Sequence, residues 1–425
     1  MKQIRAEPGE HWTSWASHRR WLLNEADKLL SFFADRSIDP QGGFYTLTTS
    51  GTPQDTRVKD LVSTARMVHC YSLAILLGYP DAERVAQQGL NALWELFRDD
   101  QQGGFYWSVD AEGAVVDGTK RAYGQAFALL AGSSAHQAGL EDGMRLIEAA
   151  DQVLETHFWE PEASRYREEF SPRWDRISSY RGGNSNMHLV EALGAAFEAT
   201  DDSRYLSRAS SVASALIDNV ARGCGWRTVE HFHDNWEIDE YYNRETPRDT
   251  YRPYGIVVGH ALEWARLLLQ LRGALGADGW HLEAAEQLFS TAMRAWDDEQ
   301  GGLFYTTDFH GQVLDRDHYQ WPIAEGIGAA ASLVRTTGKG TYEQWYRDLW
   351  CFAASHLVDR ISGGWFNLLD EHLAPVERPG VSEGKTEPYH ALQCCLVPLL
   401  DPGRGLAAGL RLSRRAEKGI TCVDL

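Results

Sequence analysis

A motif of two glycines followed by aromatic residues recurs along the chain at a period of roughly sixty residues, a regularity typical of repeat architectures. Each full copy follows a polar turn and leads into alternating residues, a pattern that predicts a short β-hairpin. Four full copies and two weaker ones occur, at Gly42-Gly-Phe-Tyr45, Gly103-Gly-Phe-Tyr-Trp107, Ser164-Arg-Tyr166, Gly223-Cys-Gly-Trp226, Gly301-Gly-Leu-Phe-Tyr305 and Gly363-Gly-Trp-Phe366. Six similar units therefore constrain the fold more than any other feature.

Two kinds of helix alternate around these motifs. An amphipathic helix is predicted before each copy, over residues 15–33, 82–97, 143–158, 203–220, 281–296 and 342–357. A more apolar helix is predicted after each copy, over residues 61–77, 122–135, 186–199, 256–271, 323–333 and 388–400. A helix that is apolar nearly all round is expected to be buried. Stacked units bury these faces against their neighbours.

The pattern predicts an all-α protein, an (α/α)6 barrel of six helical-hairpin repeats with short β-hairpins in the loops at the active-site face. An open superhelical array is the alternative, but the apolar inner helices favour closure. Length alone suggests about three domains, yet no linker or charge run divides the 425 residues. We therefore predict a single barrel domain over 1–425. Residues 403–425 are predicted to be a C-terminal tail, either on the surface or in an oligomer contact.

Charge and composition exclude several classes of partner. The formal net charge of −19 repels phosphate backbones and anionic lipid, so we expect neither nucleic acid nor a membrane as a partner. The first ten residues lack the apolar run of a secretory signal, and no stretch reaches the ~18 apolar residues of a membrane helix. The six cysteines show no Cys-x-x-Cys spacing, which predicts reduced thiols and a cytoplasmic protein. A homo-oligomer is compatible with this composition.

A polar or amphipathic side chain stands near the start of each apolar helix. In a closed ring these helix ends would meet at one mouth, and isolated buried charges are costly. Taken alone, His260 and Glu263 are explained equally well as a core histidine held by a carboxylate one helical turn away. One such residue in every repeat is hard to explain by packing. The set is Arg66, Tyr123, Asn184, His188, His260, Glu263, Trp321, Glu325 and His390.

These residue types favour proton transfer at a sugar. A histidine titrates near neutrality and can both take and return a proton, such as the C2 proton of an open-chain sugar. Arg66 could stabilise the enediolate oxygen that forms, and Trp321 could stack on the sugar. The glutamates could hold hydroxyl groups or orient a histidine. Hydrolysis by the pair Glu263 and Glu325 is the competing interpretation, but it leaves the histidines without a role.

The sequence carries no signature of a metal or of a phosphate-bearing cofactor, and we expect neither. His231 and His233 form the only tempting ligand cluster, and we predict that they pack a polar loop at the pocket rim. The glycine pairs are turns, and none opens a phosphate-binding loop. The sequence likewise contains no Gly-x-Ser-x-Gly elbow of a serine hydrolase. A small-molecule sugar is therefore the expected partner.

The chain resembles the N-acylglucosamine 2-epimerase superfamily over essentially its whole length. The resemblance rests on six segments in order, one at each apolar helix: Thr64-Ala-Arg-Met67, Tyr123-Gly-Gln-Ala-Phe127, Asn184-Ser-Asn-Met-His188, Gly259-His-Ala-Leu-Glu-Trp264, Trp321-Pro-Ile-Ala-Glu325 and Tyr389-His-Ala-Leu392. The run from Tyr389 to Pro398 is most similar to the aldose–ketose isomerase branch. Two departures stand out, because the third and fourth repeats lack a full glycine-pair turn and the C-terminal tail has no counterpart role.

The resemblance implies an (α/α)6 barrel and metal-independent proton transfer through an enediol. It implies that His260 and His390 are the acid/base pair, and that His188 acts in opening the sugar ring. It implies substrate-binding roles for Arg66, Tyr123, Asn184, Glu263, Trp321 and Glu325. The expected activity is interconversion of free monosaccharides, D-mannose and D-fructose first among them. A sugar 2-epimerase is the alternative, followed by a hydrolase or a sugar- or protein-binding barrel without catalysis.

Overall fold

The computed structural model describes residues 11–54, 58–276, 279–378 and 384–417. All twelve predicted helices are present in that part of the chain. The amphipathic ones are α1 (Ala16–Arg36), α3 (Ala82–Ala92), α5 (Asp142–Val153), α7 (Ser203–Ala213), α9 (His281–Ala292) and α11 (Gly340–Phe352). The apolar ones are α2 (Leu61–Leu77), α4 (Ala122–Ala138), α6 (Gly183–Thr200), α8 (Val258–Leu275), α10 (Gln320–Thr337) and α12 (Tyr389–Leu396).

Some helix boundaries differ from prediction for identifiable reasons. Helix α10 begins at Gln320 rather than at residue 323, because Pro322 lies in its first turn, where no backbone N–H is needed. Several helices continue at their C-terminal ends into a short π-helical or 3-10 helical segment, and one 3-10 segment precedes α1. The short helical segments are η1 (Trp12–Ser14), η2 (Leu93–Phe97), η3 (Leu154–Phe158), η4 (Ser214–Ala221), η5 (Met293–Ala295), η6 (Ala353–Leu357) and η7 (Val397–Leu399).

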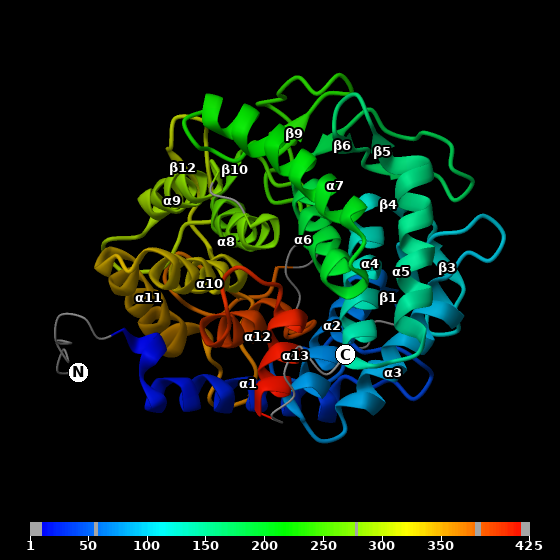
Figure 1. Cartoon of the computed structure of the whole chain (residues 1–425), viewed down its shortest axis with the longest axis horizontal. Coiled ribbons are helices and arrows are strands. Elements are labelled where there is room, and N and C mark those ends of the chain that lie inside the picture. The colour runs from blue at the N-terminus through cyan, green and yellow to red at the C-terminus, as the bar shows by residue number, and fades with distance from the viewer. Residues whose placement is uncertain (1–10, 55–57, 277–278, 379–383, 418–425) are drawn as a thin grey trace.

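The six apolar helices form a closed inner ring, as predicted. Each contacts the next in the order α2, α4, α6, α8, α10 and α12, and α12 returns to contact α2. Figure 1 shows this ring with the amphipathic helices around it. Each outer helix packs most closely on the inner helix that precedes it in the chain, and α1 packs on α12. The first helix, α1, and the last inner helix, α12, thus form the sixth pair of outer and inner helices, which closes the ring.

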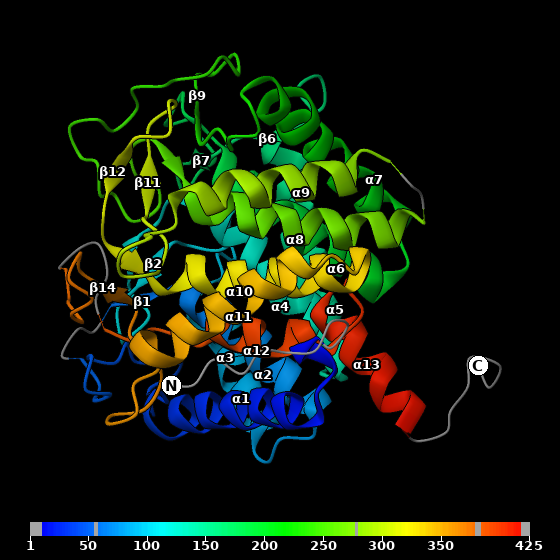
Figure 2. The same ribbon diagram turned by 90° about the vertical axis from the view of Figure 1, so that its left-hand side faces the viewer.

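Short strands gather at one end of the barrel, as Figure 2 shows. Hairpins form at β2–β3, β5–β6 and β11–β12, but most pairings join neighbouring repeats. Strand β1 pairs with β2, β4 with β7, β8 with β9, β10 with β11 and β13 with β14. A bridge between Leu47 and Lys385 joins the first and last repeats. These pairings fix where five of the inner helices begin, because β1, β4, β8, β10 and β13 lie directly before α2, α4, α6, α8 and α10.

The strand bounds are as follows: β1 (Lys59–Asp60), β2 (Ser108–Val109), β3 (Val115–Asp117), β4 (Lys120–Arg121), β5 (Trp159–Glu160), β6 (Arg165–Tyr166), β7 (Glu169–Phe170), β8 (Arg181–Gly182), β9 (His231–Phe232), β10 (Ile256–Val257), β11 (Thr306–Thr307), β12 (Val313–Asp315), β13 (His318–Tyr319) and β14 (Leu368–Leu369).

The glycine-pair motif is a turn stabilised by a buried ion pair. In the second repeat, the Asp99 carboxylate accepts hydrogen bonds from turn N–H groups and lies 2.7 Å from Nζ of Lys120. The same ammonium donates to the carbonyl oxygen of Gly103, which has a φ of 79° that glycine adopts without strain. The first and sixth repeats place Asp39 with Lys59 and Asp359 with Lys385 at the same 2.7 Å separation.

Residues 406–417 are not the surface tail that the sequence suggested, and residues 418–425 of the predicted tail lie outside the described residues. Helix α13 (Leu406–Glu417) packs against α2, α4 and α6, and Leu406, Ala407 and Leu410 are buried. Figure 2 shows α13 at the end of the barrel opposite the strands. The apolar residues at its start supply the burial that holds it there. None of the described helices is both long and apolar enough to cross a bilayer.

Candidate active site

A cavity opens among the N-terminal ends of the inner helices, on the strand-bearing side of the barrel. It encloses about 1080 Å³ of empty space, including its open mouth. Eight of the nine predicted site residues line it, namely Arg66, Tyr123, Asn184, His188, His260, Glu263, Trp321 and His390. Glu325 is not among the lining residues. It lies behind His390, a position that fits the orienting role considered for the glutamates better than contact with a substrate.

Each of the two predicted acid/base histidines is held by a buried carboxylate. Nδ1 of His260 lies 2.9 Å from Oε2 of Glu230, and Nδ1 of His390 lies 2.9 Å from Oε1 of Glu325. A carboxylate only accepts hydrogen bonds, so Nδ1 carries the proton in both rings. The Nε2 atoms are then left to take a proton from a substrate. Helical spacing had suggested Glu263 as the partner of His260, but the structure places Glu230 there instead.

Trp321 lies between these two histidines. The centroid of its ring is 5.0 Å from that of His260 and 5.7 Å from that of His390, with an interplanar angle of 36° in each case. Gly259 makes room for the indole, because a Cβ at this position would lie 2.4 Å from Cζ3 of Trp321. An apolar ring flanked by two proton carriers offers a surface on which a sugar face can stack.

Arg66 extends from α2 across the cavity wall. Its guanidinium donates to Oε1 of Glu387 at 2.9 Å and to the hydroxyl of Tyr123 at 3.1 Å. It also lies over the rings of Phe127 and Tyr389, at 4.4 and 4.6 Å from their centroids. Burial opposes its charge, but the charges of the neighbouring tyrosines and of Glu387 raise the pKa of Arg66 above its usual range. A fixed cation therefore faces the cavity.

His188 lies deeper in the cavity, between Tyr123 and two carboxyl groups. Its Nε2 is 3.4 Å from the Tyr123 hydroxyl, and its Nδ1 is 3.5 Å from Glu191 and 3.6 Å from Glu263. Burial lowers the pKa of His188 to about 4, against the opposing effect of Glu191. The ring is therefore neutral at physiological pH, and it can accept a proton.

The carboxyl groups around Arg266 carry different charges. Burial raises the pKa of Glu263 well above its usual range, and the nearby charges of Glu325 and Glu191 add to this effect. Burial also opposes the charge of Glu325, but Nε of Arg266 at 2.9 Å, together with His390, lowers its pKa. Glu191 is ionised for a similar reason, with contacts from His188, Arg266 and Tyr389. The surroundings of Glu263 therefore favour its protonated form, beside a neutral histidine.

One group in the described part of the chain has spacing suitable for a metal ion. His188, Glu191 and Glu263 offer ligand atoms that all lie within 4.8 Å of one another. The guanidinium of Arg266 lies 3.5 Å from Glu191 and 3.7 Å from Glu263, however, and it already supplies positive charge to the same oxygens. A cation bound there would be repelled by Arg266. These three side chains are therefore better suited to a site with a protonated Glu263 than to a metal site.

Sequence reasoning missed four residues of this site. Glu230 and Glu387 hold His260 and Arg66, and Tyr251 enters the wall from the long loop before α8. No local spacing connects these residues to their partners. Glu191 follows His188 by three residues on α6, a helical spacing that could have revealed it. The prediction for the rim holds for His231, which is buried and whose Nε2 lies 2.8 Å from the carbonyl oxygen of Pro253, a lining residue. His233 is exposed and does not line the cavity.

The fold and the site define a class: an (α/α)6 barrel with paired histidines at the N-terminal ends of its inner helices. The family model for N-acylglucosamine 2-epimerase (GlcNAc 2-epimerase) matches residues 42–394, and the chain belongs to this family. It is 41% identical over 402 residues to the D-mannose isomerase of Thermobifida fusca, covering 94% of this chain and 98% of that protein.

Two further comparisons relate the chain to a solved isomerase structure and to an epimerase. A crystal structure of a D-mannose isomerase superposes with a TM-score of 0.85 at 35% identity, covering 91% of this chain and 99% of that one. A cellobiose 2-epimerase of Bacteroides fragilis is 24% identical over 356 residues, covering 80% of this chain and 87% of that protein. The similarity to the named isomerases is thus higher than the similarity to this epimerase.

Proposed function

We propose that the protein is an aldose–ketose isomerase that interconverts D-mannose and D-fructose as free sugars. The observation that carries this proposal is the placement of two carboxylate-held histidines, His260 and His390, on either side of Trp321 in one cavity. The 41% identity to a D-mannose isomerase, against 24% to a cellobiose 2-epimerase, supports isomerisation over epimerisation at C2.

The reaction follows from this geometry. His188, neutral and close to the protonated carboxyl of Glu263, is placed to take the O1 proton as Glu263 gives one to the ring oxygen, which opens the sugar without creating net charge. Nε2 of one acid/base histidine then takes the C2 proton. The electron pair of the broken C2–H bond forms the C1–C2 double bond, and O1 becomes an oxyanion. Arg66 stabilises that oxyanion. Moving a proton from O2 to O1 and returning the first proton to C1 gives the ketose.

The charge of the cavity favours a sugar without a phosphate group. Asp60, Glu263 and Glu387 all line it, and the one arginine in the lining, Arg66, is paired with Glu387. A phosphate would meet carboxyl groups without an uncommitted arginine to bind it. Asn184 keeps its buried Oδ1 without a partner in the described part of the chain, which leaves an acceptor for a sugar hydroxyl.

The cellular setting and the assembly state are part of the proposal. The five cysteines in the described residues are free thiols, which supports a cytoplasmic location, and Cys422 lies outside those residues. The single domain over 1–425 and a homo-oligomer stay predictions. Size-exclusion chromatography with light scattering would measure the oligomeric state.

The test is to incubate the purified protein with D-mannose in D2O with EDTA and to follow the products by NMR. Fructose, carrying deuterium at C1 or formed by shielded transfer, is the expected product. Glucose labelled at C2 as the main product would replace the isomerase with a 2-epimerase. Saturable sugar binding without product or exchange would indicate a binding protein. Reducing ends released from disaccharides, with loss of this activity in Glu263→Gln, would indicate a hydrolase.

A further inference from the structure

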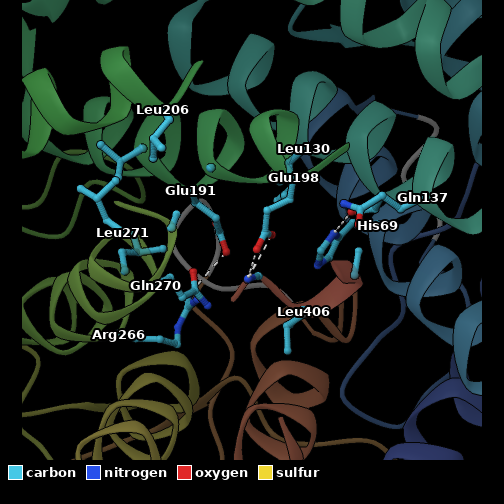
Figure 3. A pocket seen from close by; sticks show the side chains of 18 residues that line it. His69, Leu130, Gln137, Glu191, Glu198, Leu206, Arg266, Gln270, Leu271 and Leu406 are labelled. Atoms are coloured by element: carbon cyan, nitrogen blue, oxygen red, sulfur yellow. Dashed lines mark hydrogen bonds and ion pairs between the residues drawn. The ribbon is translucent and has the colours of Figure 1, made fainter. Parts of the chain in front are cut away.

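A second cavity lies at the opposite end of the barrel, where α13 covers the inner ring. Figure 3 shows it from close by. It encloses about 630 Å³ of empty space, including its mouth, and it is lined from α2, α4, α6, α7, α8 and residues 405–407. Among the described residues, none lines both cavities. Most of its wall is apolar, formed by side chains such as Leu130, Leu206, Leu271 and Leu406.

Three buried polar atoms in this wall lack a partner in the part of the chain that the structure describes. They are Nε2 and Oε1 of Gln137 and Nε2 of His69. The two side chains are only 6% and 3% exposed. Buried polar atoms in proteins are nearly always hydrogen-bonded, and leaving them unpaired is costly. Figure 3 shows Gln137 and His69 on one side of the cavity, with Arg266 and Glu191 on the other. The unpaired atoms indicate a polar occupant.

The surrounding charges select against ionic occupants. An anion would meet the carboxyl groups of Glu191 and Glu198. A cation would meet the buried guanidinium of Arg266, and it would leave the amide N–H groups of Gln137 unpaired. A neutral head that donates and accepts side by side matches the amide of Gln137, and a short hydrocarbon body matches the leucines. A primary carboxamide has this combination of groups.

We propose that this second cavity, between Gln137 and the start of α13, is a binding site for a small neutral amphiphile with a carboxamide-like head. Both amide atoms of Gln137 are almost fully covered in this structure, so the side chain turns toward the cavity when such a molecule binds. The molecule then pairs its C=O and N–H groups with Nε2 and Oε1 of Gln137, and its alkyl body lies against Leu130 and Leu406. The groups that react with the sugar in the proposed mechanism do not line this cavity, although Glu191 and Arg266, which contact His188 and Glu325, do.

The probe for this site is butyramide, with butyrate and butylammonium as charged molecules of similar shape. Titrations followed by ligand-observed NMR on the full chain should give saturable butyramide binding with a dissociation constant on the order of millimolar, as expected for a ligand of this size. The two charged probes should bind about tenfold more weakly or not at all. Equal binding of all three probes, or no saturable butyramide binding, would overturn the proposal.

Two variants locate the binding. A Cβ at Gly194, which lines the cavity, would have no heavy atom within 4 Å, so Gly194→Leu extends its side chain into the empty space. Gln137→Leu removes the partner of the head group. Both should weaken butyramide binding about tenfold or more. The matched control is Gly340→Leu, which also has open space at its Cβ and lies outside the cavity lining.

Thermal unfolding of each variant checks that the protein is folded, and the two variants provide separate tests should either fail to fold. Undiminished butyramide binding by folded Gly194→Leu or by folded Gln137→Leu would place the ligand elsewhere and refute this site. A crystal soaked in butyramide that showed only ordered waters on Gln137 would also refute it.

Discussion

Oε2 of Glu230 lies 2.9 Å from Nδ1 of His260, and both side chains are buried. The two residues are thirty positions apart, because Glu230 directly precedes β9 and His260 lies in the first turn of α8. This contact decides which ring nitrogen of His260 faces the cavity. It makes Glu230 a positioning residue for the proposed reaction, parallel to Glu325 behind His390.

Glu230→Gln should therefore lower kcat by about 10- to 1000-fold with little change in KM, because an amide can donate to Nδ1 and stabilise the wrong tautomer of His260. Steady-state kinetics on D-mannose measure both constants. The exposed Glu240→Gln is the control and should behave as wild type. A variant whose KM alone rises would show that Glu230 acts on substrate binding instead.

His260→Asn and His390→Asn should each lower kcat by at least ~10², which is the usual loss when a positioned acid or base is removed. Asparagine keeps a polar group near the buried carboxylate, so the fold should be retained, as circular dichroism can check. Exposed His233→Asn is the matched control. A near-wild-type rate in either variant would remove that histidine from the mechanism.

Gly259→Ala should lower kcat/KM by about 10- to 100-fold, because the new Cβ would lie 2.4 and 2.6 Å from two indole atoms of Trp321 and must displace the ring. The same substitution in a Trp321→Phe background should cost much less, since a phenyl ring leaves more space. A double-mutant cycle measures this coupling. Additive effects of the two substitutions would show that Gly259 acts by another route.

Glu198→Gln should stabilise the protein at alkaline pH. Burial raises the pKa of Glu198 to about 7 from an ordinary value of 4.5, while both oxygens accept from the backbone N–H of Gly405. The native state thus holds this proton more tightly than the unfolded state, so stability falls as pH rises from about 4.5 to 7. A neutral glutamine avoids this loss and can still accept the hydrogen bond.

Urea unfolding should accordingly give Glu198→Gln about 1–3 kcal/mol more stability than wild type at pH 8, and nearly none at pH 4.5. Exposed Glu148→Gln serves as the control and should change little at either pH. The same difference at both values of pH would contradict a titration effect and would point to a change in packing.

Local patterns in the sequence determined the repeats, the twelve barrel helices and eight of the residues that line the active-site cavity. The reason is physical: helical periodicity identifies a buried face, and a polar residue at the start of such a face must have a partner or a function. Arg66, His188 and His390 could be found in this way, because each interrupts an apolar helix near its N-terminal end.

Only the tertiary structure decided which side chains pair. Helical spacing predicts that Glu263 is the partner of His260. In the closed ring, His260 is hydrogen-bonded to Glu230 instead, and Glu263 lies beside His188. Closure likewise places Glu325 behind His390 rather than in the cavity. It also folds α13 over the far end, where it completes a second cavity. Local periodicity specifies the face of a helix, whereas contacts across the ring depend on how six repeats pack together.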